Sequence, residues 1–199
     1  MKKKTKAFSI IEVMIWIILF TMWIISVYAV IVSTLKMNDY NKNYVIATWL
    51  AREQIELIRN IRDSNYKKIQ IYNQINPATD NHSNLFETGT YYKVENNFSD
   101  TADFPIKVEK INVFWEWVDE LNWKMNDYKL NYSWWIYSYY SWEPTHFYKY
   151  IKVDDITYSS WWTTYVIDKW FKVTSKVIWY DRWYHEYEVK SLFTDFKMF

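Results

Sequence analysis

The N-terminal segment contains the feature that most constrains how this chain folds. Four lysines precede Ala7, and the 23 residues from Val13 to Leu35 carry no charged side chain before Lys36. At about 1.5 Å of rise per residue, a helix of this length spans about 34 Å, which is enough to cross the hydrocarbon core of a bilayer. The segment therefore predicts a membrane helix. Because the lysines precede it, we expect the N-terminus in the cytoplasm and the bulk of the chain outside.

Glu12 is the unusual residue of this segment, because it stands directly before the uncharged run. An ionised carboxylate inside an apolar segment costs about 2.5 kcal/mol or more, so such a residue is by default a functional hypothesis. The carboxylate requires a cationic partner. Glu12 is therefore the first candidate site residue.

The segment KAFSIIEVMI contains Phe8 and Glu12 four positions apart. This block resembles the N-terminal signal of type IV prepilins and type II secretion pseudopilins. In that family a short basic leader is removed just before an aromatic residue, the new amine is N-methylated, and a glutamate occupies the fifth mature position. The resemblance implies a leader of residues 1–7, cleavage between Ala7 and Phe8, N-methylation of Phe8, and an assembly role for Glu12. The family prefers glycine where this chain has Ala7, which implies slower processing.

A secretory signal peptide and a plain signal anchor are the alternatives for this N-terminus. A secretory signal has an apolar core of about 7–15 residues followed by small residues at the cleavage site, whereas this run is longer. A plain anchor leaves the spacing of Phe8 and Glu12 unexplained, although Glu12 can then lie in the headgroup region at little cost.

Hydrophobic periodicity predicts that the helix continues beyond the membrane. We expect a transmembrane or filament-core helix over residues 8–35 and an amphipathic continuation over residues 36–63. Between Asn43 and Asp63, apolar residues recur every three or four positions, and charged residues take the other faces. The expected buried residues are Ala47, Leu50, Ala51, Ile55, Ile58 and Ile61. The expected outward charged residues are Arg52, Glu53, Glu56, Arg59 and Arg62.

Two ion pairs at helical spacing, Glu56–Arg59 and Arg59–Asp63, are expected to support this half of the helix. We expect the helix to end between Asp63 and Asn65. The segment also resembles the lower half of the long helix in minor pilins and pseudopilins, which implies that its apolar face packs on a β-sheet. A nucleic-acid-binding helix is disfavoured because acidic residues are interleaved with the basic ones.

The remainder of the chain, residues 64–199, predicts one extracytoplasmic, β-rich globular domain. Residues 64–105 form a connection, and alternating apolar and polar residues follow. The expected strands are Ile106–Phe114, Tyr128–Tyr132, Phe147–Val153, Thr164–Ile167, Phe171–Ile178 and Glu186–Phe193. The last two are expected to form a hairpin with an apolar face on the helix and a charged face in water. The fold class is α+β, with a long N-terminal helix packed on an antiparallel sheet, as the resemblance to pilins also implies.

Glycine and tryptophan occur in unusual numbers, with 1 glycine and 14 tryptophans in 199 residues, against an average glycine content of about 7%. Several tryptophans stand between strand-like segments, where turns favour residues that accept positive φ. These are Trp134, Trp135, Trp161, Trp162, Trp179 and Trp183. Trp16 and Trp23 lie in the membrane helix, where small residues favour close packing. We hypothesise that the source organism decodes UGA as glycine and that these codons have been translated as tryptophan. A genuinely tryptophan-rich protein is the alternative, and the coding DNA distinguishes the two.

The sequence contains no pattern typical of an enzyme, and we expect no cofactor or metal. The absence of cysteine excludes disulfides, cysteine nucleophiles and thiolate metal sites. The histidines, His82, His146 and His185, form no ligand motif. The carboxylate pairs Asp119-Glu120 and Asp154-Asp155 leave calcium open, although neither resembles an EF-hand loop.

The resemblance implies a minor pilin or pseudopilin of a type IV pilus or type II secretion-like filament. Its expected partners are a prepilin peptidase, other pilin subunits, the membrane, and an inner-membrane assembly platform with its ATPase. Removal of the four leader lysines changes the net charge from +1 to −3, which disfavours specific nucleic-acid binding. The alternative function is a single-pass anchored β-domain that binds glycan or another surface ligand through its 19 tyrosines. The filament reading predicts a membrane protein before assembly and a cell-surface or periplasmic filament afterwards.

Overall fold

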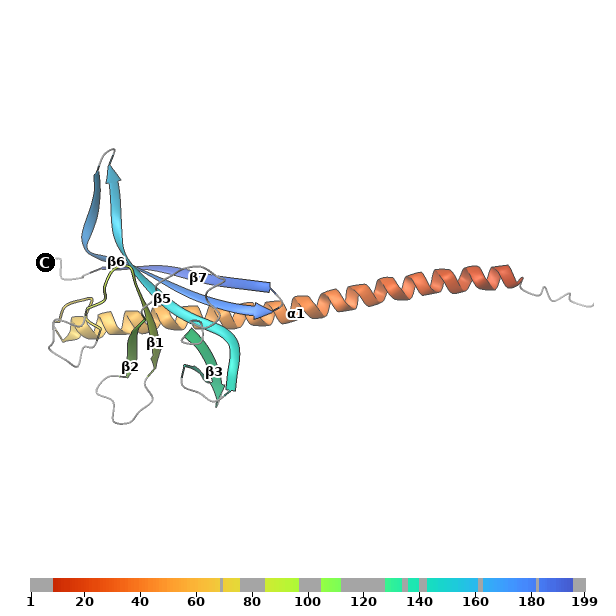
Figure 1. Ribbon diagram of the computed structural model, residues 1–199, viewed down its shortest axis with the longest axis horizontal. Helices are drawn as coiled ribbons and strands as arrows, with labels where there is room; N and C mark the ends of the chain where they lie inside the picture. The colour runs from red at the N-terminus through yellow and green to blue at the C-terminus, as the bar shows by residue number, and fades with distance from the viewer. Residues whose placement is uncertain are drawn as a thin grey trace, which may run out of the picture. The chain divides into compact units, whose positions relative to one another are not determined.

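The computed structural model describes residues 9–68, 70–75, 85–96, 105–111, 128–133, 136–139, 143–160, 163–181 and 183–194. The chain divides into two compact units, Met1–Asn43 and Tyr44–Phe199. Helix α1 (Ile10–Lys67) contributes to both units, and the described strands belong to the second (Figure 1). This arrangement confirms the α+β layout of a long N-terminal helix followed by an antiparallel sheet.

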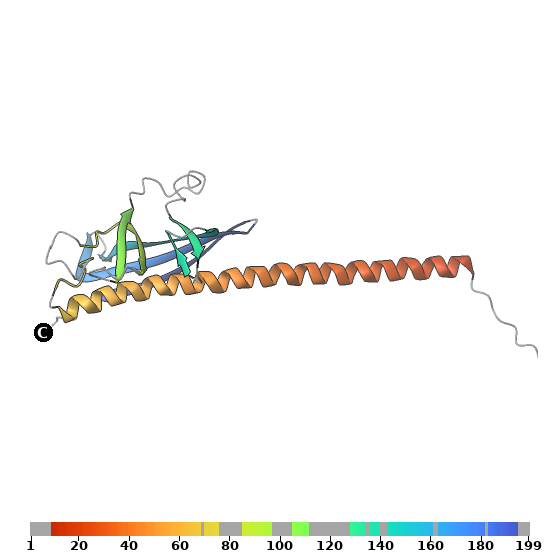
Figure 2. The ribbon, with the colours of Figure 1, turned by 90° about the horizontal axis from the view of Figure 1, so that it is seen from below.

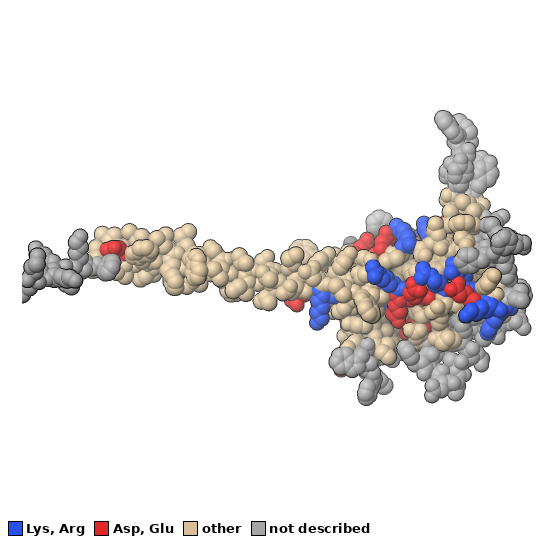
Figure 3. Space-filling view, turned by 180° about the vertical axis from the view of Figure 1, so that it is seen from behind, with Lys and Arg blue, Asp and Glu red and all other residues tan. Residues whose placement is uncertain are grey.

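In the first unit, α1 is an apolar helix whose side chains are open to the surroundings. The large hydrophobic residues from Ile10 to Ile31 that are exposed have exposed fractions between 40% and 80%. Figure 3 shows uncharged side chains along most of this part of α1. Among the described residues, α1 is the one helix long and apolar enough to cross a membrane. The prediction of a membrane-length helix is therefore confirmed at the level of length and composition.

In the second unit, α1 presents a buried stripe to the sheet and a charged face to water (Figures 2 and 3). All six residues predicted for the stripe are buried. Three further residues of α1, Gln54, Leu57 and Asn65, are also buried. The expected pair Glu56–Arg59 forms, but Asp63 pairs with Arg62 rather than with Arg59.

The end of α1 corrects the predicted boundary, because the helix continues to Lys67. Asn65 is fully buried, and its side-chain amide donates hydrogen bonds to the carbonyls of Tyr72 at 3.3 Å and Gln74 at 2.7 Å. Because the Asn65 side chain bonds to carbonyls of the segment that follows, and not to the backbone of its own turn, it does not end the helix.

The second unit contains one antiparallel sheet, of which seven strands lie among the described residues. These are β1 (Thr90–Asn96), β2 (Ile106–Ile111), β3 (Lys129–Ser133), β4 (Ile136–Ser138), β5 (Glu143–Ser160), β6 (Thr163–Asp181) and β7 (Trp183–Thr194). Strand β6 lies between β5 and β7. On its other edge, β5 pairs with both β1 and β3, which continue outward to β2 and β4. The two hairpins β1–β2 and β3–β4 are therefore neighbours along one edge of β5.

Alternation along the central strands separates a face toward α1 from an outer face. Phe147, Ile151 and Val153 on β5 are buried, as are Val173 and Val177 on β6. Two core clusters result. One gathers Ile55, Ile58 and Ile61 of α1 with Tyr92, Val94, Phe171 and Phe193 of the strands. The other gathers Ala47, Leu50 and Ala51 with Leu130, Phe147 and Trp179.

Several strand predictions need correction. The two segments expected at Thr164–Ile167 and Phe171–Ile178 belong to one long strand, β6, and β5 extends beyond its predicted bounds at both ends. Strands β1 and β4 were not predicted, whereas the hairpin between the last two strands forms as expected. The predicted strand Ile106–Phe114 is described only to Ile111.

Two of the six tryptophans expected in turns lie among the described residues. Trp179 lies within β6 opposite His185 and is 1% exposed, so its assignment to a turn was wrong. Trp183 begins β7 and is 76% exposed. Trp134, Trp135, Trp161 and Trp162 lie outside the described residues.

Candidate functional site

The candidate site is the beginning of α1. Glu12 lies in the first turn of the helix, and the backbone N–H of Val13 donates a 3.2 Å hydrogen bond to the carbonyl of Ser9. Ser9 is therefore the N-cap residue, and Glu12 occupies the third helical position. A negative charge in the first turn is favoured by the helix macrodipole, by about 0.3–1 kcal/mol for an exposed residue.

Ser9 is a residue that the sequence analysis missed at this site. A serine at the N-cap and a glutamate three residues later form the capping-box signature, in which each side chain can satisfy a free backbone N–H of the first turn. The pattern Ser-x-x-Glu was visible in the sequence. Glu12 thus stands at the position from which the acid of a capping box acts on the helix start, in addition to any role toward another chain.

Downstream of Glu12, three hydroxyl groups of the apolar segment find acceptors within their own helix. Thr21 donates to the carbonyl of Ile17 at 2.7 Å, Ser26 to Met22 at 2.9 Å and Thr34 to Val30 at 2.9 Å. These bonds lower the cost of placing the hydroxyls in an apolar medium. Glu12 is the ionisable residue of this helix start, and its carboxylate lies in the first turn, before the uncharged run begins.

A shallow, open hollow lies one residue after Glu12 on α1. It is lined by Val13, Trp16, Ile17 and Phe20, which share one face of the helix. The ring of Phe20 also stacks on that of Trp23, with centroids 6.2 Å apart. The surface beside the carboxylate is therefore apolar and aromatic. The two processing residues, Ala7 and Phe8, lie outside the described residues.

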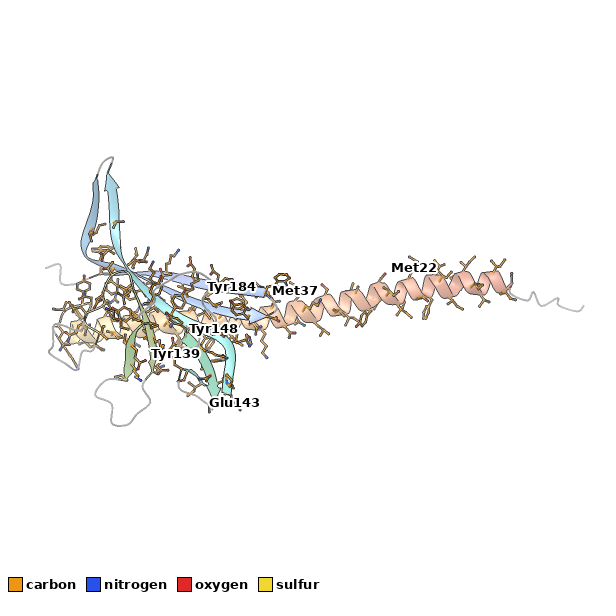
Figure 4. The ribbon with its side chains drawn as sticks, viewed as in Figure 1. Met22, Met37, Tyr139, Glu143, Tyr148 and Tyr184 are labelled. Carbon is orange, nitrogen blue, oxygen red and sulfur yellow. The ribbon has the colours of Figure 1, made fainter. Side chains whose placement is uncertain are left out.

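A second polar cluster lies in the second unit, where the hairpins β1–β2 and β3–β4 leave a gap along β5. We call Glu53, Glu95, Asn96, Tyr139 and Lys149 the gap cluster. The Tyr139 hydroxyl donates to the carbonyl of Lys149 at 2.8 Å, at the point on β5 between its pairings with β1 and β3 (Figure 4). Glu95, which is 7% exposed, accepts hydrogen bonds from the hydroxyl of Ser138 and the backbone N–H of Tyr139.

Lys149 is the most deeply buried charge of the gap cluster. Its side chain is 0% exposed, and its ammonium lies 3.1 Å from a carboxylate oxygen of Glu53 on α1. Asn96 donates a long 3.5 Å hydrogen bond to the other oxygen of the same carboxylate. Glu53 was predicted to face outward, which is wrong. The cluster links α1 to two hairpins, and its burial fits a structural role.

The outer face of the sheet carries the surface relevant to the alternative function. Tyr148, Tyr180 and Tyr184 make edge-to-face contacts in series, at centroid distances of 6.4 Å and 5.8 Å, and Figure 4 labels the first and last. The Tyr184 hydroxyl donates to Glu186 at 2.7 Å, and burial together with this carboxylate raises the pKa of Tyr184. The three rings contact one another, and Tyr180 remains 40% exposed to solvent.

Metal ligation finds no support in the part of the chain that the structure describes. No group of three His, Asp or Glu side chains there can hold a metal ion. Asp154 pairs with Lys152 and Lys172, and Asp155 accepts a 2.5 Å hydrogen bond from Thr88. His185 stacks on Trp179. Asp119, Glu120 and His82 lie outside the described residues.

No protein family model, curated protein or solved structure matches the chain.

Proposed function

We propose that this protein is a structural subunit, a minor pilin or pseudopilin, of a type IV pilus or type II secretion-like filament. One observation carries the proposal. Glu12 is an ionisable residue in the first turn of a helix whose next 23 residues are uncharged, and the resemblance places a new N-terminal amine at Phe8, four residues earlier. The site supplies an anion, the Glu12 carboxylate, and a cation, the Phe8 amine, at the N-terminal end of an apolar helix.

The proposed chemistry is assembly rather than catalysis. After cleavage between Ala7 and Phe8, the methylated amine of one subunit is neutralised by Glu12 of its neighbour. Pairing offsets the desolvation of two charges in an apolar core. The exposed hydrophobic side chains of α1 are first covered by lipid and then by the helices of other subunits.

The proposal implies a set of partners and two locations. A prepilin peptidase removes residues 1–7, and an inner-membrane platform with its ATPase drives assembly with other pilin subunits. Before assembly the protein spans the membrane once, with its N-terminus in the cytoplasm and its bulk outside. Afterwards it belongs to a cell-surface or periplasmic filament. No enzymatic activity, cofactor or specific nucleic acid is part of this function.

Processing tests this function directly. Co-expression with a prepilin peptidase should remove Met1 to Ala7, and intact mass should show a chain that begins at Phe8 with an added methyl group. Ala7→Gly should be cleaved faster, because the family's peptidases favour glycine there. If neither variant loses its leader, the filament proposal is wrong.

The tyrosines of the outer sheet face favour the second candidate, a single-pass anchored β-domain that binds glycan. Aromatic rings at a surface can stack on sugars or bases. This candidate predicts an intact mass that retains the leader lysines, and it predicts no effect of the peptidase.

A further inference from the structure

Strands β5 and β6 extend past the rest of the sheet as a two-stranded arm. We define the arm as residues 156–160 of β5 and 163–167 of β6. Pairing of β5 with β1 reaches Val153, and pairing of β6 with β7 reaches Trp170. Beyond these points the two strands pair only with each other among the described residues, from Thr157 with Val166 to Ser160 with Thr163. Figure 1 shows the arm extending away from the other strands.

The base of the arm is fixed to the core, and the register changes just above it. Phe171, which is 5% exposed, pairs with Asp155, and Asp155 accepts the hydrogen bond from Thr88. The register then shifts between Asp155 and Thr157. Such irregularities bend a strand and increase its twist. The arm is therefore a separate element built on a rigid base.

Both edges of the arm present backbone N–H and C=O groups that no described strand pairs. Exposed edges of this kind are templates for another strand, and natural proteins block them with charges, proline or short length. Residues 156–167 contain no charged residue and no proline. The outer strand β7 has instead Glu186, Glu188 and Lys190 along its length. The arm thus lacks the protection that the neighbouring edge carries.

The composition of the arm also favours strand addition. An isolated two-stranded hairpin is at best marginally stable in water, and Val166 and Ile167 are 54% and 41% exposed. Short uncharged segments rich in β-branched and aromatic residues, without proline, are those that stack strand on strand. A third strand along the edge would give the arm the stability that it lacks alone.

We propose that the arm pairs edge to edge with the same arm of a second copy of this chain. Backbone edges select an extended strand as the occupant, and two uncharged arms bring no like charges together. Because β5 and β6 are antiparallel, the β6 edge of one copy meets the β5 edge of the next in antiparallel fashion when both copies have the same orientation. Contacts between different surfaces of identical subunits repeat in an open array. The inference rests on the second unit alone and stands independently of the filament function.

Disulfide cross-linking tests the pairing cleanly, because the chain contains no cysteine. Two differently tagged full-length copies are expressed together in membranes, one with Thr157→Cys and the other with Val166→Cys. Opposite residues of adjacent strands have Cα separations within the range that a disulfide bridges. We expect a mixed disulfide dimer. A second pair, with Thr164→Cys in place of Val166→Cys, tests a strand register shifted by two residues.

The controls separate strand pairing from chance collisions. Glu188→Cys, on the charged strand β7, should give at least fivefold less mixed dimer with Thr157→Cys than the arm positions give. Adding Ile167→Lys to the Val166→Cys copy should reduce the dimer by a similar factor and leave the thermal unfolding midpoint unchanged, because the arm lies outside the core clusters.

The filament function is tested separately by Glu12→Leu, which should leave the cross-link unaltered. Three results would each overturn the proposed pairing. These are no dimer at either register, equal dimer from Glu188→Cys, and a cross-link of Thr157→Cys to a different protein alone.

Discussion

The ammonium of Lys149 on β5 lies 3.1 Å from the carboxylate of Glu53 on α1, and the lysine side chain has no exposed surface. This pair joins the helix to the centre of the sheet at the gap between two hairpins. A buried charge is tolerated when its partner and additional hydrogen bonds are in place, and removal of one partner leaves it uncompensated.

Removing the acid of this pair should destabilise the second unit strongly. Glu53→Leu should lower the free energy of unfolding by about 3 kcal/mol, because Lys149 then remains buried without its counter-charge. The double variant Glu53→Leu/Lys149→Met should recover most of the loss, since an apolar pair of similar volume often replaces an ion pair at little cost. Denaturant unfolding of the full chain in detergent measures both.

The exposed pair Lys190–Glu188 supplies the control, because both side chains are largely open to water. Lys190→Met should change the free energy of unfolding by less than about 1 kcal/mol, as surface pairs usually do. If Glu53→Leu costs no more than Lys190→Met, the gap cluster does not hold the helix on the sheet.

A pH dependence is expected from Glu186. Hydrogen bonds from Lys176 and then from Tyr184 hold the pKa of this carboxyl below its usual value of 4.5. The folded state therefore gains stability from Glu186 above the unfolded pKa, and that gain is lost as the pH falls through the lower folded pKa. Because the side chain is 45% exposed, the gain should be a few tenths of a kcal/mol.

Glu186→Gln isolates this contribution. The unfolding midpoints of the wild-type protein and Glu186→Gln should differ at pH 7 and converge as the pH falls below 4.5. Glu188→Gln, on the same strand, is the matched variant. If the two unfolding midpoints still differ by the same amount at pH 3, the difference comes from packing rather than from ionisation.

Much of the second unit followed from alternation and helical periodicity. Six of the residues buried between Ala47 and Ile61 were predicted individually, because their spacing matches the helix repeat, whereas Gln54 and Leu57 were missed. The gap cluster was missed although a signal was present. Lys149 stands at the same parity as Phe147, Ile151 and Val153, which places it on the buried face. A lysine on a buried face is unfavourable unless a carboxylate faces it. That carboxylate belongs to Glu53 on α1, and strand alternation alone does not reveal it.

Long-range pairings explain the other differences. Alternation weakens between Ile167 and Phe171, so β6 was read as two strands, although β5 pairs with it on both sides of that stretch. The start of α1 was predicted as a site from its chemistry. Ser9 could be assigned as the N-cap only after the structure had shown that the helix begins at Ile10.

The structure sharpens the hypothesis that UGA encodes glycine. Ser133 pairs with Ile136, and Ser160 pairs with Thr163, so each connection is two residues long. Two-residue hairpin connections favour residues that accept positive φ, with Gly-Gly among the preferred pairs. The sequence has Trp-Trp at both connections. Trp179 differs, because it fills the core beside Ala47 and Ala51, and its loss would leave a large cavity.

We therefore expect UGA codons at positions 134, 135, 161 and 162, and UGG at Trp179. Peptides from the native cells that cover Ser160 to Thr164 should have two glycines, with a mass lower by two indole-sized amounts. Tryptophan masses at both hairpin connections would end the recoding hypothesis.

Substitution of Glu12 separates the filament subunit from a plain anchor, because the two functions predict opposite signs. In an anchor, Glu12→Leu removes a costly charge from the membrane boundary, so insertion and surface display should be unchanged or improved. In a filament subunit the same change leaves the amine of a neighbouring Phe8 unpaired in an apolar environment, a loss of about 3–5 kcal/mol for one partner of a buried pair. The fraction of mature protein recovered in sheared filaments should therefore fall sharply.

The position of Glu12 in the first turn requires a second variant, because a change there also alters the helix start. Glu12→Gln keeps the side-chain length and the hydrogen-bonding capacity of a capping box while it removes the charge. Ser9→Ala removes the cap, which costs about 1 kcal/mol, and keeps the charge. If charge pairing governs assembly, Glu12→Gln should fail as Glu12→Leu does, and Ser9→Ala should still assemble, with peptidase cleavage of each variant checked by mass. Assembly of Glu12→Gln at the wild-type level would limit Glu12 to capping the helix and remove it from the assembly site.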